Sequence, residues 1–282
     1  MRATQTRTLQ FERFTLLNRT LHVLMIISFM SLALTGMTLK FSYTGWAAVL
    51  SRMLGGYETA GFIHRAAAVT MFGIFVTHLW DLNRRRRAEY GGSPWRMLTG
   101  PDTMLFTRRD LRELAASLKW FVGAGPRPRY GRWTYWEKFD YFAVFWGIFV
   151  IGSTGLMLWF PVFFTRFLPG WLINVATIIH SDEALLATGF IFTIHFFNTH
   201  FRPDRFPMDP VIFTGRMSVA EFKEDRPREY EELARTGELE KHLVDPLDPH
   251  MVRVMRIFGF TALAIGLGLI LAIIWTQLFG YR

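Results

Sequence analysis

The stretch HRAAAVTMFGIFVTH, residues 64–78, decides the fold because a histidine stands at each end of a largely apolar segment. An imidazole buried in hydrocarbon without a hydrogen-bond partner or a metal costs several kcal/mol. The residues between the two histidines offer little to satisfy them. We therefore expect His64 and His78 to meet partners on neighbouring helices.

Composition favours a membrane protein over a soluble globular domain. The 282 residues are 51% hydrophobic and 16% aromatic, with a net charge of +9. The chain has no cysteine, which excludes disulfides, iron–sulfur clusters, thiolate zinc sites and the C-x-x-C-H attachment of c-type heme. The apolar run at 16–39 is long enough to span a bilayer and has no small-residue cleavage pattern after it. We expect it to remain as a helix and not to act as a signal peptide.

Five runs of about 20 apolar residues predict membrane-spanning helices. They cover 16–39, 61–81, 139–160, 173–198 and 257–279. The expected fold class is all-α, an integral membrane bundle of five helices. Its expected parts are a four-helix core at 1–200, a charged cytoplasmic loop at 201–256 and an additional fifth helix at 257–282.

Lysine and arginine predict the orientation of the bundle. Three segments assigned to one side hold 27 of the 32 basic residues: the N-terminal segment through Arg19, 82–138 and 201–256. The positive-inside rule places them in the cytoplasm, with the N-terminus inside and the C-terminus periplasmic, in a bacterial cytoplasmic membrane. The NRRRR run at 83–87 favours contact with anionic headgroups over nucleic-acid binding. The segment 110–123 predicts an amphipathic helix on the inner membrane surface.

The histidines fall at two depths. His22, His78 and His195 lie near the inner ends of their helices, and His64 and His180 lie near outer ends. At 1.5 Å per residue, 14 or 15 residues separate the levels by about 21–22 Å, a spacing that suits two stacked hemes. The 15-residue step from His180 to His195 puts them on one face only if the helix is distorted, for which a single π-bulge suffices.

Neutral imidazole is a good ligand for heme iron, and helical bundles bind cofactors between facing helices. Two imidazoles on one iron leave no open position, which suits electron transfer and argues against oxygen chemistry. Two other interpretations stay open: a histidine satisfied within the core, and a proton relay. We assign His200 to the membrane interface, and His242 and His250 to the surface.

Three further residues fit a heme environment. Gly36 follows His22 by 14 residues, so it faces the same way at the outer level, where a side chain would collide with a porphyrin. Gly155 has the same expected role, and ordinary small-residue helix packing is the alternative for both. Arg65 is expected to pair with heme propionates or to extend to the outer interface.

Several motifs carry a resemblance to a known family. These are NRTLH at 18–22, GFIHR at 61–65, RWTYWEKFDYFAVFWGIFVIGSTGLMLWFPVFFTRFLP at 132–169, and IIH with TIHFF at 178–197. They resemble the cytochrome b (gamma) subunit of respiratory formate dehydrogenases, a family that includes the cytochrome b subunits of nickel–iron hydrogenases. The similarity covers roughly residues 8–235. It implies two heme b groups, with His64 and His180 as ligands of the outer heme iron and His22 and His195 of the inner.

The chain departs from that family in four ways. The family has four helices, so the fifth is an addition that we expect to pack on a partner or on lipid. Its ligands on helix 4 are one residue closer together, and it has no counterpart of His78, which competes with His22 for the inner iron. His78 with His195 would resemble the cytochrome b of quinol:cytochrome c complexes. The family's menaquinone pocket uses a tyrosine–asparagine segment that reads WTYWE here, so Thr134 and Glu137 are the candidate quinone contacts.

The expected function is transmembrane electron transfer through two b-type hemes. A quinone, menaquinone or ubiquinone, would exchange electrons on the cytoplasmic side. A chain without cysteine needs an iron–sulfur or multiheme cytochrome c subunit on the outer side to complete an oxidoreductase complex. The direction of flow is not predicted. The alternative function is a heme-free membrane anchor or proton-conducting subunit of a larger complex.

Overall fold

The computed structural model describes residues 9–280 and is 75% helical with very little sheet. The chain ends at 1–8 and 281–282, whose sides of the membrane the basic residues predict, lie outside the described residues. Contacts divide the chain into two compact units. We call Leu21–His78, Phe142–Asp209 and the segment from Phe258 onward the bundle unit. The sheet unit comprises the chain through Thr20, Leu79–Tyr141 and Pro210–Ile257.

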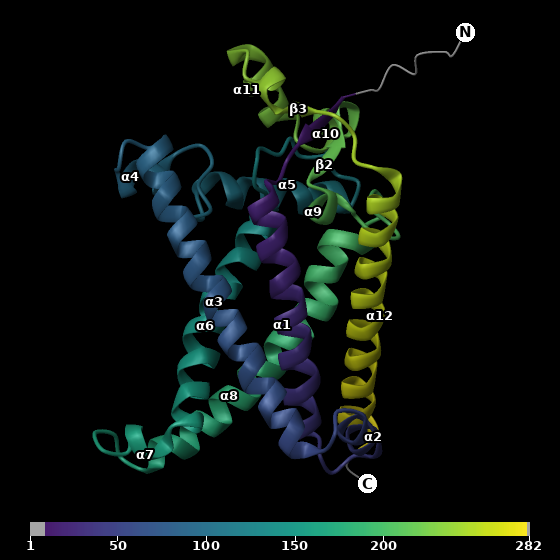
Figure 1. The fold of residues 1–282 in the computed structure, drawn as a ribbon. Coiled ribbons are helices and arrows are strands. Elements are labelled where there is room, and N and C mark those ends of the chain that lie inside the picture. The colour runs from purple at the N-terminus through teal and green to yellow at the C-terminus, as the bar shows by residue number, and fades with distance from the viewer. Residues whose placement is uncertain (1–8, 281–282) are drawn as a thin grey trace. The chain divides into compact units, whose positions relative to one another are not determined.

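Five helices of the described chain are long and apolar enough to cross a membrane, which confirms the predicted number (Figure 1). They are α1 (Leu16–Lys40), α3 (Tyr57–Glu89), α6 (Tyr135–Trp159), α8 (Trp171–Phe190) with its π-helical continuation to Phe201, and α12 (Pro249–Phe279).

Two of these helices extend beyond their apolar runs. The basic residues at 84–87 continue α3 because acidic partners lie one turn away. Arg84 pairs with Asp81 at 2.8 Å, and Arg85 pairs with Glu89 at 3.3 Å. Likewise α12 begins eight residues before the predicted start at 257, at a proline, which the first turn of a helix accepts. Hydropathy therefore locates the membrane spans but underestimates the lengths of the helices that contain them.

The sheet unit has a small core of its own. The strand β1 (Gln10–Glu12) lies between β2 (Arg216–Ser218) and β3 (Leu243–Val244), and both pairs are antiparallel. Phe11 pairs with Met217 on one side and is fully buried. Its ring stacks on Phe222 at 3.6 Å between centroids. Part of the predicted segment 201–256, from Val211 to Val244, therefore contains short helices and two strands that pair with β1.

Short elements complete the sheet unit. They are α4 (Pro94–Thr99), α5 (Arg108–Phe121), α9 (Val211–Thr214), α10 (Val219–Asp225), α11 (Pro227–Thr236) and the 3₁₀ turn Leu239–His242. His250 is exposed as predicted, whereas His242 lies against the ring of Phe11 at 5.5 Å between centroids. The bundle unit adds the short helices α2 (Gly45–Met53) and α7 (Pro161–Phe164).

The fourth span is distorted as its histidine spacing predicts. After Phe190 the α-helical pattern gives way to π-helical turns at Ile191–His195 and Phe197–Phe201. Such turns absorb extra residues in a helix and occur frequently at functional sites. The distortion thus lies between His180 and the end of the span.

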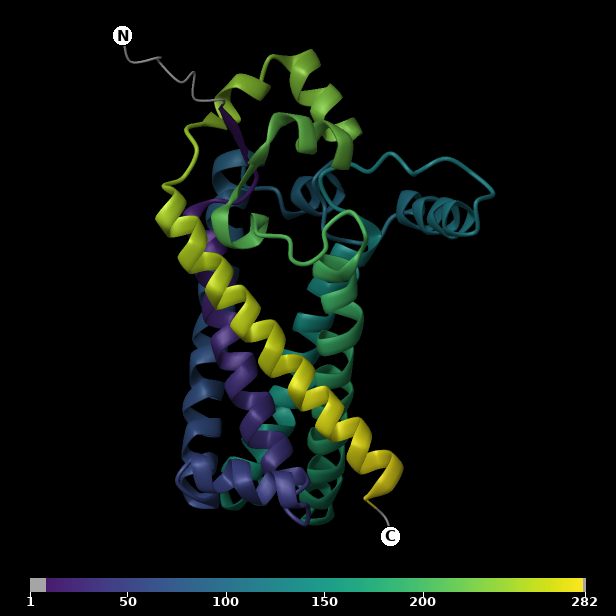
Figure 2. The same cartoon turned by 90° about the vertical axis from the view of Figure 1, so that its right-hand side faces the viewer.

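The fifth helix packs on this chain's own helices, beyond the expected contacts with lipid or a partner. A Cβ on Gly266 of α12 would lie 2.7 Å from the ring of Phe192 and 2.9 Å from that of Phe196, beside the π-helical turns. At its far end, Trp46 of α2 donates a hydrogen bond to Thr276 at 2.8 Å. Figure 2 shows α12, in yellow, as one continuous helix.

We expect Gly266→Val to destabilise the protein by about 1–3 kcal/mol, because the added side chain overlaps the two phenylalanine rings. Gly268→Val is the matched control. It lies in the same helix, and a Cβ there would meet nothing within 4 Å. Thermal unfolding of the purified protein in detergent measures both. Equal midpoints for the two variants would contradict the packing described here.

Candidate functional site

Two histidines from different helices face each other at the outer level of the bundle unit. His64 of α3 and His180 of α8 have ring centroids 6.1 Å apart, with their planes at 71°. A metal binds each imidazole nitrogen at about 2 Å, so one iron between two imidazoles puts the ring centroids about 6 Å apart. The predicted outer pair is therefore brought together at a separation that fits a shared iron.

Hydrogen bonds determine which nitrogen of His64 carries its proton. The hydroxyl of Thr35 donates its single proton to the Ser31 carbonyl at 2.6 Å. The same oxygen lies 2.9 Å from His64 Nδ1, so it accepts a proton from that nitrogen. The Leu32 carbonyl lies near enough to the His64 ring to favour a proton on it. Nδ1 therefore carries the proton, and the lone pair of Nε2 is available to a ligand.

His180 is held in the same way by α6. Its Nδ1 lies 3.0 Å from the Ile151 carbonyl, which can only accept, so Nδ1 again carries the proton. The hydroxyl of Thr154 donates to the Val150 carbonyl at 2.7 Å and lies 3.4 Å from Nδ1. Metal-binding histidines typically donate their second N–H to such a carbonyl, which fixes the ring and raises its basicity.

A glycine makes each of these contacts accessible. A Cβ on Gly36 would lie 3.3 Å from Cε1 of His64, and a Cβ on Gly155 would lie 3.0 Å from Cε1 of His180. A side chain at either glycine would therefore crowd an imidazole. The expected role of Gly36 and Gly155, to leave room for a porphyrin, stays a prediction.

The two supports share one pattern. A carbonyl at position i, a threonine at i+3 and a glycine at i+4 hold one histidine of the neighbouring helix. We call each set a Thr–Gly bracket: Leu32, Thr35 and Gly36 for His64, and Ile151, Thr154 and Gly155 for His180. The TG dipeptides were the available sequence signal, and only the glycines were singled out from it.

The inner level gathers three histidines. His22 of α1 interacts electrostatically with His195 and His200 of the π-helical segment. Its Nδ1 is buried without a hydrogen-bond partner. A buried imidazole nitrogen in this state is costly unless a ligand engages the ring. His22 and His195, the predicted inner pair, are therefore near enough to interact electrostatically.

His200 was assigned to the interface but is only 7% exposed. Its Nδ1 accepts a hydrogen bond from the Asp209 backbone N–H at 3.3 Å. Residues five apart lie about 140° from each other on an α-helix. The i→i+5 pattern of the π-helical turns brings His195 and His200 toward one side, which an α-helical reading of the sequence misses.

His78, the alternative inner ligand, lies in the contact between α3 and α6. Its ring meets that of Phe145 at 6.1 Å between centroids. The choice between His22 and His78 as the partner of His195 stays a prediction. Arg65 is exposed beside His64, with its guanidinium near Gly61.

Thr134 and Glu137, the candidate quinone contacts, lie in an ionic network of the sheet unit. One carboxylate oxygen of Glu137 accepts from Thr134 N–H and Oγ1–H, at 2.8 and 2.7 Å. The other accepts from Arg13 at 3.2 Å and from Arg226 at 3.0 Å. Both oxygens are therefore engaged in structural contacts, and Thr134 is fully buried. Their quinone role stays a prediction.

Burial is the largest influence on Arg13 and lowers the pKa of its guanidinium. Arg226 lowers this pKa further, whereas Glu137 and Glu229 oppose the shift. The Arg13 cation therefore depends on these two carboxylates. Removal of one member of such a buried network therefore costs more stability than removal of one partner of an exposed ion pair.

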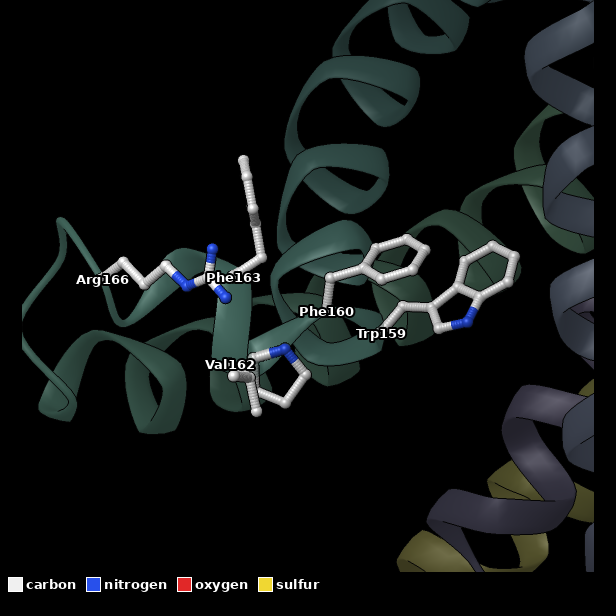
Figure 3. Close-up of a pocket in the computed structure, with 6 residues that line it drawn as sticks. Trp159, Phe160, Val162, Phe163 and Arg166 are labelled. Carbon is white, nitrogen blue, oxygen red and sulfur yellow. The ribbon is translucent and has the colours of Figure 1, made fainter.

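Two surface pockets of the bundle unit contain none of the predicted site residues. The first, of about 360 Å³, is lined by the end of α6 and by α7, with Trp159, Phe160 and Arg166 among its residues (Figure 3). The second, of about 440 Å³, is lined by the α8 segment and α12, with Gly189 and Gln277 among its residues.

Within residues 9–280, no group of three or more His, Asp or Glu side chains is arranged to hold a bare metal ion. A heme needs only two axial ligands from the protein, because the porphyrin supplies the others. No protein-family model matches this chain, and no curated protein matches it.

We expect Glu137→Gln to lower stability by about 3 kcal/mol, because it removes a carboxylate that pairs with both buried guanidinium groups, those of Arg13 and Arg226. The control is Glu232→Gln, whose ion pair with Arg235 is exposed and should contribute under about 1 kcal/mol. Denaturant unfolding followed by tryptophan fluorescence compares them. If both variants unfold at the same denaturant concentration, the network is not a stabilising element.

Proposed function

We propose that this chain is the membrane subunit of an oxidoreductase complex, a diheme cytochrome b of the formate dehydrogenase and hydrogenase type. His64 and His180 would hold the iron of one b-type heme, and His22 and His195 that of the other. The observation that carries the proposal is the pair of Thr–Gly brackets, because each engages Nδ1 of a half-buried histidine and leaves the Nε2 lone pair available to a ligand.

The residues fit the cofactor on independent grounds. The outer rings have the separation of two imidazoles on one iron, the brackets fix their tautomers, and His22 Nδ1 is buried without a partner. Hemes ligated on both faces carry single electrons without opening a coordination site to oxygen. The chain's part is to hold the rings, exclude water and set the distance between the two levels.

The surroundings of the proposed path follow from the charge distribution. The segments rich in lysine and arginine would face the cytoplasm, with the N-terminus inside and the C-terminus periplasmic. A menaquinone or ubiquinone would react on the cytoplasmic side. An iron–sulfur or multiheme cytochrome c subunit would exchange electrons on the outer side, in a bacterial cytoplasmic membrane.

The alternative is a heme-free anchor or a proton-conducting subunit. A histidine relay needs imidazoles that exchange protons at both nitrogens. The brackets engage the Nδ1 protons of His64 and His180 in hydrogen bonds to α1 and α6. This arrangement favours ligation over conduction.

The purified chain should contain two hemes by pyridine hemochrome assay, with the reduced spectrum of low-spin heme b. We expect His64→Leu to retain one heme and His22→Leu to retain one, because each loses an axial ligand. His78→Leu should retain both, because His22, and not His78, stands in a motif that resembles the ligand motif of the family. His250→Leu, an exposed position, is the control.

A chain without heme would overturn the proposal. Loss of the inner heme in His78→Leu together with its retention in His22→Leu would instead move that ligand to α3. Either result is distinguishable from misfolding, because the control and the helical content by circular dichroism report on the fold.

Thr35→Val should raise the midpoint potential of the outer heme while both hemes remain bound. The hydrogen bond to His64 Nδ1 increases the basicity of the ring and so stabilises the ferric state. Thr38→Val is the matched control, because Thr38 lies in the same helix and its hydroxyl donates to the Leu34 carbonyl. Potentiometric titration of the two variants compares them, and an equal potential in both would contradict the role of the bracket.

A further inference from the structure

The helix α5 in the sheet unit has its polarity reversed relative to an ordinary surface helix. Its polar residues Asp110, Glu113 and Ser117 are buried against the protein. Its apolar residues point outward, with Leu111 68% exposed and Leu118 57% exposed. An exposed row of leucines on a helix indicates contact with an apolar medium outside the protein.

The buried side of α5 is fixed by three polar contacts. Asp110 pairs with Lys138 at 3.0 Å, and Glu113 pairs with Arg228 at 2.8 Å. Ser117 hydrogen-bonds the Tyr130 hydroxyl at 2.8 Å. Rotation of the helix to bury its leucines would leave these buried groups unpaired, at a cost of several kcal/mol. The outward direction of the apolar side is therefore a stable property of the fold.

The contact with Lys138 also indicates where α5 lies relative to the membrane surface. Lys138 lies in the first turn of α6, one of the five spans, and it donates to the Leu105 carbonyl at 3.1 Å as well as to Asp110. A span of 25 residues exceeds the roughly 20 needed to cross the hydrocarbon core, so its first turn lies at the interface. The start of α5 is therefore held at the level where α6 enters the membrane.

The outward surface of α5 has two adjacent sectors. At about 100° per residue, four exposed apolar side chains share one arc about 80° wide: Leu111, Leu114, Leu118 and Phe121. Three exposed basic side chains occupy the next arc, about 40° wide: Arg108, Arg112 and Lys119. We call the first the apolar face of α5 and the second its basic edge.

We propose that the apolar face of α5 lies in the headgroup–acyl boundary of the bilayer and that its basic edge binds the phosphates of anionic lipids. The two sectors match the two chemical zones of an anionic leaflet, apolar chains beside negative charge. A protein partner would have to reproduce both zones, whereas the bilayer is already present at the level of Lys138. This inference needs the spans only and is independent of heme binding.

The absence of cysteine makes a direct test simple, because one introduced thiol takes one label. Leu118→Cys is labelled with an environment-sensitive fluorophore, and the full-length protein is reconstituted in nanodiscs with lipids spin-labelled near the headgroup. We expect blue-shifted emission and strong quenching. Ala234→Cys on α11, which is exposed, is the control and should show neither effect. Leu111→Cys must behave like Leu118→Cys, because it shares the same arc.

A label at 111 and 118 that is as solvated as the one at 234 would overturn the proposal. The basic edge is tested by combining Arg108→Gln, Arg112→Gln and Lys119→Gln with the label at 118. Quenching should be stronger in nanodiscs that contain anionic lipid, and the triple variant should lose that difference. No difference between the two lipids for the unaltered edge would remove the anionic part of the inference.

Discussion

The structure of the bundle unit depends on how the imidazoles of His64 and His180 find hydrogen-bond acceptors for their Nδ1 protons. A helix backbone in an apolar environment normally offers nothing to a neighbouring side chain, because its carbonyls already accept from residues four positions later. Each carbonyl has a second lone pair, however, and a glycine four residues on leaves it accessible. His180 reaches the Ile151 carbonyl across Gly155 in this way.

At His64 the closest contact of Nδ1 is with the hydroxyl of Thr35, at 2.9 Å, and Gly36 takes the place of Gly155. The hydroxyl of Thr35 donates its proton to the Ser31 carbonyl of its own helix, so its oxygen accepts from the imidazole of His64. Two helices that carry no histidine at this level thereby determine which nitrogen of their neighbours is free. Residues that would not touch the heme thus set the tautomer of the histidines proposed to bind its iron.

The sequence predicted the five spans, because apolar length is a local property. His180 and His195, 15 residues apart, could share a face only in a distorted helix, and π-helical turns lie between them. The sequence did not predict the strand pairing of Phe11 with Met217, because strands of three residues leave no period to detect. The TG dipeptide alone was not sufficient either. Thr188 and Gly189 form another, and a Cβ on Gly189 would meet nothing within 4 Å.

The fifth helix, α12, supports the π-helical segment of the fourth span through the contact of Gly266 with Phe192 and Phe196. Phe192 and Phe196 lie in the π-helical segment, a rare helix geometry that occurs frequently at functional sites. Phe192 also meets Phe29 of α1 at 5.9 Å between centroids, so its ring has contacts on two sides. The helix α12 thus packs against the part of the fourth span that carries His195 and His200. It contributes to the predicted inner histidine level through the backbone geometry that it stabilises.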